Sequence, residues 1–159
     1  MAKPILYIGA DHAGYRLKEQ LKQLFSRQYQ LVDCGNAVYD TNDDYPIFAE
    51  KVAREAVKHE AFGVLICGTA EGVCIAANKV PGARAIAACS PIIAKLARQH
   101  NNANILCLAG GRMRRPVPGL GLTTAAASKI VHAFLTTPFS NATRHKRRVK
   151  MITRIEQRR

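Results

Sequence analysis

The chain repeats one pattern along its length: a short apolar run rich in β-branched residues, a turn of small residues, and a longer amphipathic stretch. The first copy is Ile5–Gly9 followed by Tyr15–Arg27, whose apolar residues fall on one helical face. Alternating strands and helices favour parallel strands, because parallel neighbours need crossover connections. The pattern therefore predicts an α/β protein with helices on both faces of a sheet.

Apolar runs of strand length occur at five places, residues 5–9, 30–35, 62–67, 84–89 and 104–109. The third, Phe62–Cys67, is apolar almost throughout, which indicates burial on both faces. Amphipathic stretches predict helices at residues 15–27, 46–59, 73–79, 91–99, 123–135 and 145–157. We expect a single Rossmann-like, doubly wound domain over residues 1–159, with a five-stranded, mostly parallel sheet and a basic C-terminal helix.

The formal net charge of +13 raises nucleic acid as a partner. However, residues 144–159 hold eight of the 24 Lys and Arg against one acid, so about half of the excess charge lies in one terminal segment. None of the ten Tyr and Phe lies in residues 140–159, so this segment lacks aromatic rings for base stacking. Among the functions considered, nucleic-acid binding is therefore ranked last.

The five cysteines are an odd number, without Cys-x-x-Cys pairs or His partners at zinc spacing. We therefore expect reduced thiols, no metal and a cytoplasmic protein. No apolar run approaches the roughly 20 residues of a membrane span, and the N-terminus does not resemble a signal peptide. The first strand is not followed by Gly-x-Gly-x-x-Gly, which argues against a dinucleotide cofactor.

Parallel sheets of this type bind ligands beyond the carboxyl ends of their strands. Several polar or small residues follow the predicted strands there: Asp11 and His12; Cys67, Gly68 and Thr69; Ser90; Gly110, Gly111 and Arg112. These residues are therefore candidates for a ligand-binding site.

Cys67 ends a predicted buried strand and is followed by the turn Gly68–Gly72 and a helix start. Unpaired N–H groups at a helix start bind anions and favour a thiolate nearby. A base beside an anion cradle is what enolisation requires. A packed cysteine before a glycine-rich turn explains the same residues, and taken alone they favour that simpler explanation.

Three other groups also have two interpretations. Asp11 and His12 could bind hydroxyls or phosphate, or Asp11 could cap the next helix. His100 could transfer a proton or interact with a helix dipole. Arg144 and Arg148, four residues apart on a helix, could clamp a phosphate or belong to a solvated basic face.

Six stretches, in order, resemble the ribose-5-phosphate isomerase B and galactose-6-phosphate isomerase family over nearly the whole chain. They are Gly9–Gly14, Asp44–Pro46, Cys67–Thr69, Ile75–Lys79, His100–Asn104 and Arg144–Val149. Each is weak alone, but chance does not readily place six in order.

The resemblance implies aldose–ketose isomerisation of a sugar phosphate through a cis-enediol, without metal or cofactor. It implies that Cys67 is the base and that His100, with Asp11, opens the sugar ring. It assigns Thr69 to catalysis, within an anion hole shared with Gly68, Ala70, Glu71 and Gly72. It assigns phosphate binding to His12, Arg144 and Arg148, and the pocket lining to Tyr45, Asn101 and Arg112. It also implies a homodimer with sites between subunits, or a tetramer built from such dimers.

The chain departs from the family at the turn, where Gly-Thr-Gly-x-Gly is usual and Ala70 replaces the second glycine. If that position needs a positive φ, alanine costs about 1 kcal/mol or shifts the turn. Glu71 adds a carboxylate beside the expected anion hole, and the loop Met113–Gly121 is longer than usual. Two alternatives therefore stay open: a six-carbon (allose or galactose) 6-phosphate isomerase, and a sugar-phosphate-binding relative without activity.

Overall fold

Five strands form one sheet in the computed structural model, which describes residues 2–112 and 117–158. The strands are β1 (Ile5–Ala10), β2 (Gln30–Asp33), β3 (Phe62–Cys67), β4 (Ala85–Ala87) and β5 (Ile105–Ala109). Their order is β2-β1-β3-β5-β4, and every neighbouring pair is parallel. The predicted α/β fold is confirmed, and the sheet is parallel throughout rather than mostly parallel.

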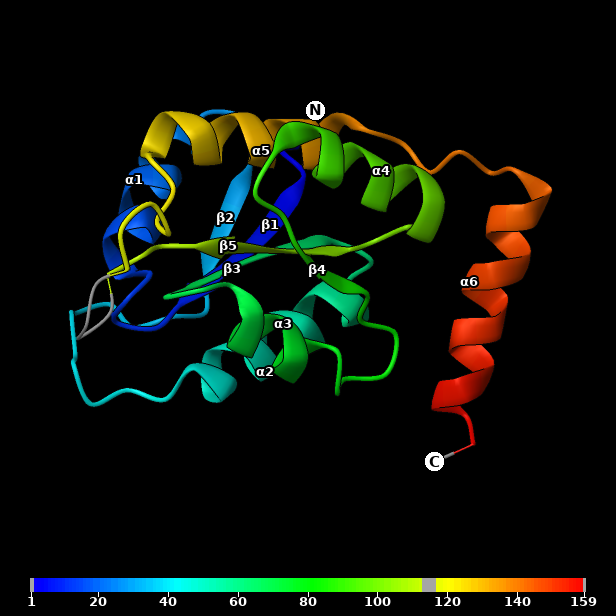
Figure 1. Cartoon of the computed structure of the whole chain (residues 1–159), viewed down its shortest axis with the longest axis horizontal. Helices are drawn as coiled ribbons and strands as arrows, with labels where there is room; N and C mark the ends of the chain where they lie inside the picture. Colours follow the sequence, from blue (N-terminus) through cyan, green and yellow to red (C-terminus); the bar gives the residue numbers. More distant parts are fainter. Residues whose placement is uncertain (1, 113–116, 159) are drawn as a thin grey trace.

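The helices are α1 (Tyr15–Phe25), α2 (Tyr45–Lys58), α3 (Glu71–Ala77), α4 (Pro91–Asn101), α5 (Thr124–Thr136) and α6 (Thr143–Glu156). Helices α1, α4 and α5 cover one face of the sheet, and α2 and α3 cover the other (Figure 1). Helix α6 stands beyond the end of α4 (Figure 1). Among the described residues, no helix is long and apolar enough to cross a membrane.

The period of two along each strand divides the core between the two faces. In β3, Val64 and Ile66 pack in the cluster beneath α1, α4 and α5. Leu65 and Cys67 pack in the other cluster, with α2 and α3. The continuous apolar run of β3 thus reflects burial on both faces, as its sequence indicates.

Several element boundaries differ from the prediction by one or two residues. β2 ends at Asp33 because the chain turns at Gly35, where a Cβ would lie 3.0 Å from the Ala10 nitrogen. β4 begins only at Ala85, since the Arg84 N–H donates to the side chain of Asn104 at 2.8 Å. α3 begins two residues early, at Glu71. Of the predicted loop Met113–Gly121, residues 113–116 lie outside the described residues.

The strand order places a topological switch point in the middle of the sheet. β1 pairs with β2 on one side and with β3 on the other, so the chain reverses its direction of progress between β1 and β3. Ligands of such sheets bind at the carboxyl ends of the strands beside this point. Asp11 directly follows β1, and Cys67 is the last residue of β3.

Candidate active site

Cys67 is fixed by backbone contacts at the carboxyl edge of the sheet. In the register of β3 and β5 it is paired with Ala109, and its carbonyl oxygen accepts from the Gly110 N–H at 2.7 Å. The Gly68 carbonyl oxygen accepts from the Gly111 N–H at 3.0 Å, so pairing continues past both strands. The Cys67 thiol is free, and the residue is 4% exposed. These backbone contacts fix the position from which the thiol can reach a bound ligand.

The turn after Cys67 is shaped for an anion. Ala70 adopts the left-handed backbone conformation, with φ 73°, and directly precedes α3. The Thr69 hydroxyl oxygen accepts from the Glu71 N–H at 3.3 Å. Among the described residues, the N–H groups of Ala70 and Gly72 have no acceptor. Unpaired N–H groups at a helix start attract negative charge.

Two side chains border this turn from outside. The ring of Tyr45, the first residue of α2, lies against Gly72, where an added Cβ would come within 2.8 Å of the ring. Only glycine therefore lets the tyrosine lie over the start of α3. Glu71 is exposed, in the first turn of that helix. Its carboxylate is thus solvated instead of buried beside the thiol.

The turn that carries Asp11 packs against the end of β3, next to Cys67. An added Cβ on Gly14 would lie 2.4 Å from the Ile66 carbonyl oxygen, in the residue before Cys67. Asp11 accepts from the Gly14 N–H at 3.0 Å and is 6% exposed. Burial raises the pKa of Asp11 above its ordinary value, and the opposing hydrogen bond from Gly14 does not cancel this effect. A carboxyl group of this kind can hold and donate a proton.

His12 is held by an aspartate that the sequence did not single out. The ring Nδ1 lies 2.6 Å from Asp43 Oδ1, and the His12 backbone N–H donates to the same oxygen at 3.1 Å. Asp43 lies 31 positions away, in the loop between β2 and α2. No periodicity marks it among the neighbouring acids Asp40 and Asp44, so only the spatial contact identifies it.

Arg112 follows β5 at the same edge of the sheet. It lines a cavity of about 560 Å³ together with Arg16, Tyr39 and the glycines that follow β5. Gly110 packs against the turn after β1, since its added Cβ would lie 2.5 Å from the Ala13 carbonyl oxygen. The cavity therefore adjoins the Asp11 turn, and its two arginines suit a negatively charged ligand.

The remaining predicted residues gather elsewhere, where the end of α4 meets α6. His100 lies in the last turn of α4, and its ring is 4.4 Å, centroid to centroid, from the ring of His145. Arg144 Nε donates to His145 Nε2 at 3.2 Å. His145, to which the sequence analysis gave no role, is 5% exposed.

This second group is strongly cationic. Burial lowers the pKa of His145, and the nearby His100, Arg144 and Arg148 lower it further. Asn101, the last residue of α4, lines a groove of about 310 Å³ that α6 borders. So many neighbouring positive groups favour a bound anion such as phosphate.

The two groups lie at opposite edges of the sheet. Cys67 is level with Ala109, whereas α4 ends just before β5 begins at Ile105. At roughly 3.3 Å per residue, that strand alone separates the edges by about 13 Å. Figure 1 shows α6 at the side away from the turn that leads from β3 into α3. One chain therefore does not bring His100, Arg144 and Arg148 to Cys67.

Within the described residues, no three His, Cys, Asp or Glu side chains gather in a way that could hold a metal ion. The groups at the two clusters are a thiol, carboxyl groups, imidazoles, guanidinium groups and N–H donors.

Comparison with known proteins gives one consistent result. The family model described as Ribose/Galactose Isomerase matches residues 6–152. Ribose-5-phosphate isomerase B of Mycolicibacterium paratuberculosis is 44% identical over 96% of this chain and 91% of the relative, and that of Escherichia coli K12 is 41% identical over 95% of each.

Solved structures agree with these sequences. The Mycoplasma genitalium ribose-5-phosphate isomerase B with bound ribulose-5-phosphate superposes with a TM-score of 0.87, at 40% identity over 100% of both chains. The type B ribose 5-phosphate isomerase of Trypanosoma cruzi gives a TM-score of 0.87, at 35% identity over 98% of both chains.

Proposed function

Because the chain belongs to the ribose/galactose isomerase family, we propose that it is an aldose–ketose isomerase that interconverts ribose 5-phosphate and ribulose 5-phosphate. Its family, its relatives and the ligand of the Mycoplasma genitalium protein support this substrate. The reaction moves one proton between carbon 2 of the aldose and carbon 1 of the ketose, with no net oxidation or reduction.

Cys67 is the proposed base. As a thiolate it takes the proton from carbon 2 of the open-chain aldose, and the electron pair moves through carbon 1 onto the carbonyl oxygen. The product is a cis-enediolate. The thiol then returns its proton to carbon 1, while the hydroxyl proton passes from oxygen 2 to oxygen 1 and the ketose forms. One base suffices because it lies over one face of the planar intermediate and reaches both carbons from that face.

The main structural support for the proposal is the conformation of the turn beside the Cys67 thiol. Ala70 keeps φ at 73°, so the N–H groups of Ala70 and Gly72 stay open at the start of α3. Fixed donors aimed at developing charge contribute about 3 kcal/mol each to the stability of a transition state. This arrangement makes catalysis a better explanation than binding alone, because the alanine has not displaced the turn.

The proposed contacts to the substrate's phosphate come from both groups of residues, the one around Cys67 and the one where α4 meets α6. His12 lies at the Cys67 edge, while Arg144 and Arg148 lie at the α6 edge with His100. We therefore propose a homodimer in which the α6 edge of one subunit completes the Cys67 edge of the other. In this arrangement the two arginines bind the phosphate and His100, with Asp11, opens the sugar ring.

All five cysteines are free thiols. A reducing compartment keeps thiols in this state, so we propose that the enzyme works in the cytoplasm. Fractionation of cells that express a tagged chain would test this location.

The deciding experiment is a turnover assay in buffer with a metal chelator. The purified protein is given ribose 5-phosphate, allose 6-phosphate and galactose 6-phosphate in separate reactions, and ketose formation is measured. We expect turnover of ribose 5-phosphate, with kcat/KM higher than for either six-carbon sugar. Turnover of a six-carbon sugar alone would assign a different substrate. Binding of all three without turnover by a folded protein would make the chain a binding-only relative.

A further inference from the structure

Asp43 controls which side of the His12 ring is available to a ligand. Its Oδ1 contacts both the His12 backbone N–H and ring Nδ1, at 3.1 and 2.6 Å. A carboxylate only accepts hydrogen bonds, so this contact keeps the proton on Nδ1. The Asp43 side chain is 5% exposed, whereas that of His12 is 29% exposed. The ring is therefore held from the buried side, with Nε2 left for a ligand.

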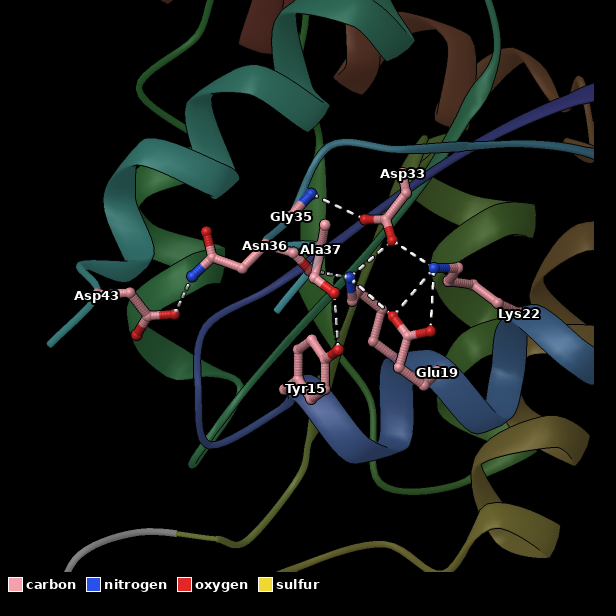
Figure 2. Close-up of polar contacts among 9 residues, drawn as sticks. Tyr15, Glu19, Lys22, Asp33, Gly35, Asn36, Ala37 and Asp43 are labelled. Atoms are coloured by element: carbon pink, nitrogen blue, oxygen red, sulfur yellow. Dashed lines mark hydrogen bonds and ion pairs between the residues drawn. The ribbon is translucent and has the colours of Figure 1, made fainter. Parts of the chain in front are cut away.

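The second oxygen of Asp43 is held as well. Asn36 Nδ2 donates to Asp43 Oδ2 at 3.0 Å (Figure 2). Each carboxylate oxygen thus has its own partner, one on the turn after β1 and one on the turn after β2. With both oxygens engaged, the carboxylate cannot rotate without losing a hydrogen bond.

Asn36 is in turn fixed by a buried charge. The Asn36 carbonyl oxygen accepts from Lys18 Nζ at 2.8 Å, and Lys18 also contacts Asp33 Oδ2 at 2.7 Å and Glu19 Oε1 at 3.0 Å. The Lys18 side chain is 0% exposed, so these three partners satisfy a fully buried ammonium group. A buried charge without partners is strongly destabilising, so any movement of Asn36 is opposed.

Asp33 anchors the opposite end of this chain of contacts. It binds Lys18 and also Lys22, whose Nζ lies 2.6 Å from Asp33 Oδ2 (Figure 2). Burial raises the pKa of Asp33, but the hydrogen bonds from the two lysines outweigh burial, so its pKa lies below the ordinary value. Asp33 is thus charged at neutral pH, and the ion pairs persist there.

We propose that Asp43 is a positioning residue, which holds His12 with Nε2 toward the substrate, and that Asn36 and the buried Lys18 hold Asp43 in place. The inference rests on the proposed function, because it treats His12 as a substrate contact. Asp43 itself does not touch the substrate. Its effect on catalysis passes through His12.

Kinetics of Asp43→Ala should show a loss of binding rather than of chemistry. We expect KM for ribose 5-phosphate to rise about tenfold, by analogy with the lower end of the loss seen when the hydrogen-bond partner of a metal-binding histidine is removed. kcat should change less than about twofold, because a contact made equally in ground and transition states affects KM alone. Asp40→Ala is the matched control, since Asp40 lies in the same loop and its carboxylate accepts from the Asn42 N–H. It should leave both constants unchanged.

A double-mutant cycle separates positioning from general damage to the fold. If Asp43 acts through His12, Asp43→Ala causes no further rise in KM once His12 is alanine. If the two substitutions raise KM by independent factors that multiply in the double variant, the proposal is wrong. If Asp43→Ala does not fold, Asn36→Ala serves in the same cycle: it leaves the His12–Asp43 contact in place but removes the contact to Oδ2. It should raise KM by a smaller factor that also vanishes in the His12→Ala background.

A spectroscopic measurement is independent of turnover. In protein with ¹⁵N-labelled histidine, the Nδ1–H signal of His12 should be present in the wild type and lost in Asp43→Ala. An unchanged signal would refute the positioning role even in an active enzyme. A lost signal in a protein without isomerase activity would uphold the contact and reject only the proposed reaction.

Discussion

Ala70 occupies a backbone conformation that glycine tolerates better. Its φ is 73°, it is 4% exposed, and it sets the direction of the N–H groups at the start of α3. The left-handed conformation costs an L-residue about 1–2 kcal/mol relative to glycine. The protein keeps the turn and bears this strain in its native state, which is one of the two outcomes that the sequence allowed for alanine here.

Comparison of two alanine-to-glycine variants measures this strain. Ala70→Gly loses one methyl group and gains freedom in the unfolded chain, but it also loses the strain. Ala76→Gly makes the same chemical change inside α3, where it should cost about 1 kcal/mol. We expect the free energy of unfolding of Ala70→Gly to exceed that of Ala76→Gly by about 1–2 kcal/mol. Urea denaturation measures both, and equal values would mean that Ala70 is unstrained.

Asp11 should lower the free energy of unfolding at neutral pH, where its carboxyl group is buried. Burial raises its folded-state pKa, so the native protein binds this proton more tightly than the unfolded chain does. The resulting stability is complete below the unfolded pKa and is lost as pH rises through the folded pKa. Asp11→Asn stays uncharged and can still accept from the Gly14 N–H, so this loss is removed.

We therefore expect Asp11→Asn to be more stable than the wild type at pH 7, by up to about 1 kcal/mol, and to be much less active. The gain in stability should vanish toward about pH 3, where Asp11 is protonated in both states. Thermal unfolding at a series of pH values gives the comparison, with the exposed Asp40→Asn as control. A variant that is less stable at pH 7 would contradict the assigned direction.

Among individual residues, those that directly follow strands could be predicted from the sequence, but the residues that they contact could not. Cys67, Asp11 and His12 could be placed at one edge because β-strand patterns locate the ends of strands. Asp43 and His145 could not, because their contacts join segments that no periodicity links. A hydrogen bond across 31 positions depends on how a loop folds, and three acids lie close together in that loop.

At the scale of elements, the strongest patterns were predicted almost to the residue. β3 matches its prediction, since a run apolar on both faces has no other stable place than the middle of a sheet. β4 was predicted to begin one residue too early because the Arg84 N–H donates to the side chain of Asn104, a contact that a pattern of apolar residues does not reveal. β4 is an outer strand of the sheet with one neighbouring strand, so its ends depend on such individual contacts.

Glycine at position 14 allows the turn after β1 to pack against β3. An added Cβ would lie 2.4 Å from the Ile66 carbonyl oxygen, and a backbone atom inside a paired strand cannot move aside. Gly14→Ala should therefore lower the free energy of unfolding by about 1–3 kcal/mol, as overpacking does. It should also lower kcat, because the displaced turn carries Asp11 and faces the residue before Cys67.

Gly119→Ala is the control for that variant. Gly119 has φ 77° but nothing within 4 Å of an added Cβ, so the variant bears backbone strain without overpacking. It should lose about 1 kcal/mol of stability and keep its kcat. If both variants lost stability equally and both stayed active, close packing of the turn on β3 would not position the site.

At the scale of the whole molecule, the proposed reaction needs groups that one chain keeps apart. Ring opening and proton transfer act on carbons 1 and 2 of one sugar, yet His100 and Cys67 lie at opposite edges of the sheet. This separation follows from topology alone: in a parallel sheet, a crossover helix ends at the edge where strands begin. The separation of His100 from Cys67 could therefore be predicted from the order of strands and helices, whereas the side-chain contacts on each side could be seen only in the structure.

A hybrid dimer tests whether two chains share a site. Cys67→Ala lacks the base, and Arg144→Ala/Arg148→Ala lacks the phosphate contacts, so each homodimer should be inactive at low substrate concentration. In a hybrid, one site carries both defects and the other carries none. Hybrids co-expressed with different tags and purified through both should therefore show about half of the wild-type activity per dimer. If each site lay within one chain, every site in the hybrid would keep a defect and the purified hybrid would be as inactive as its parents.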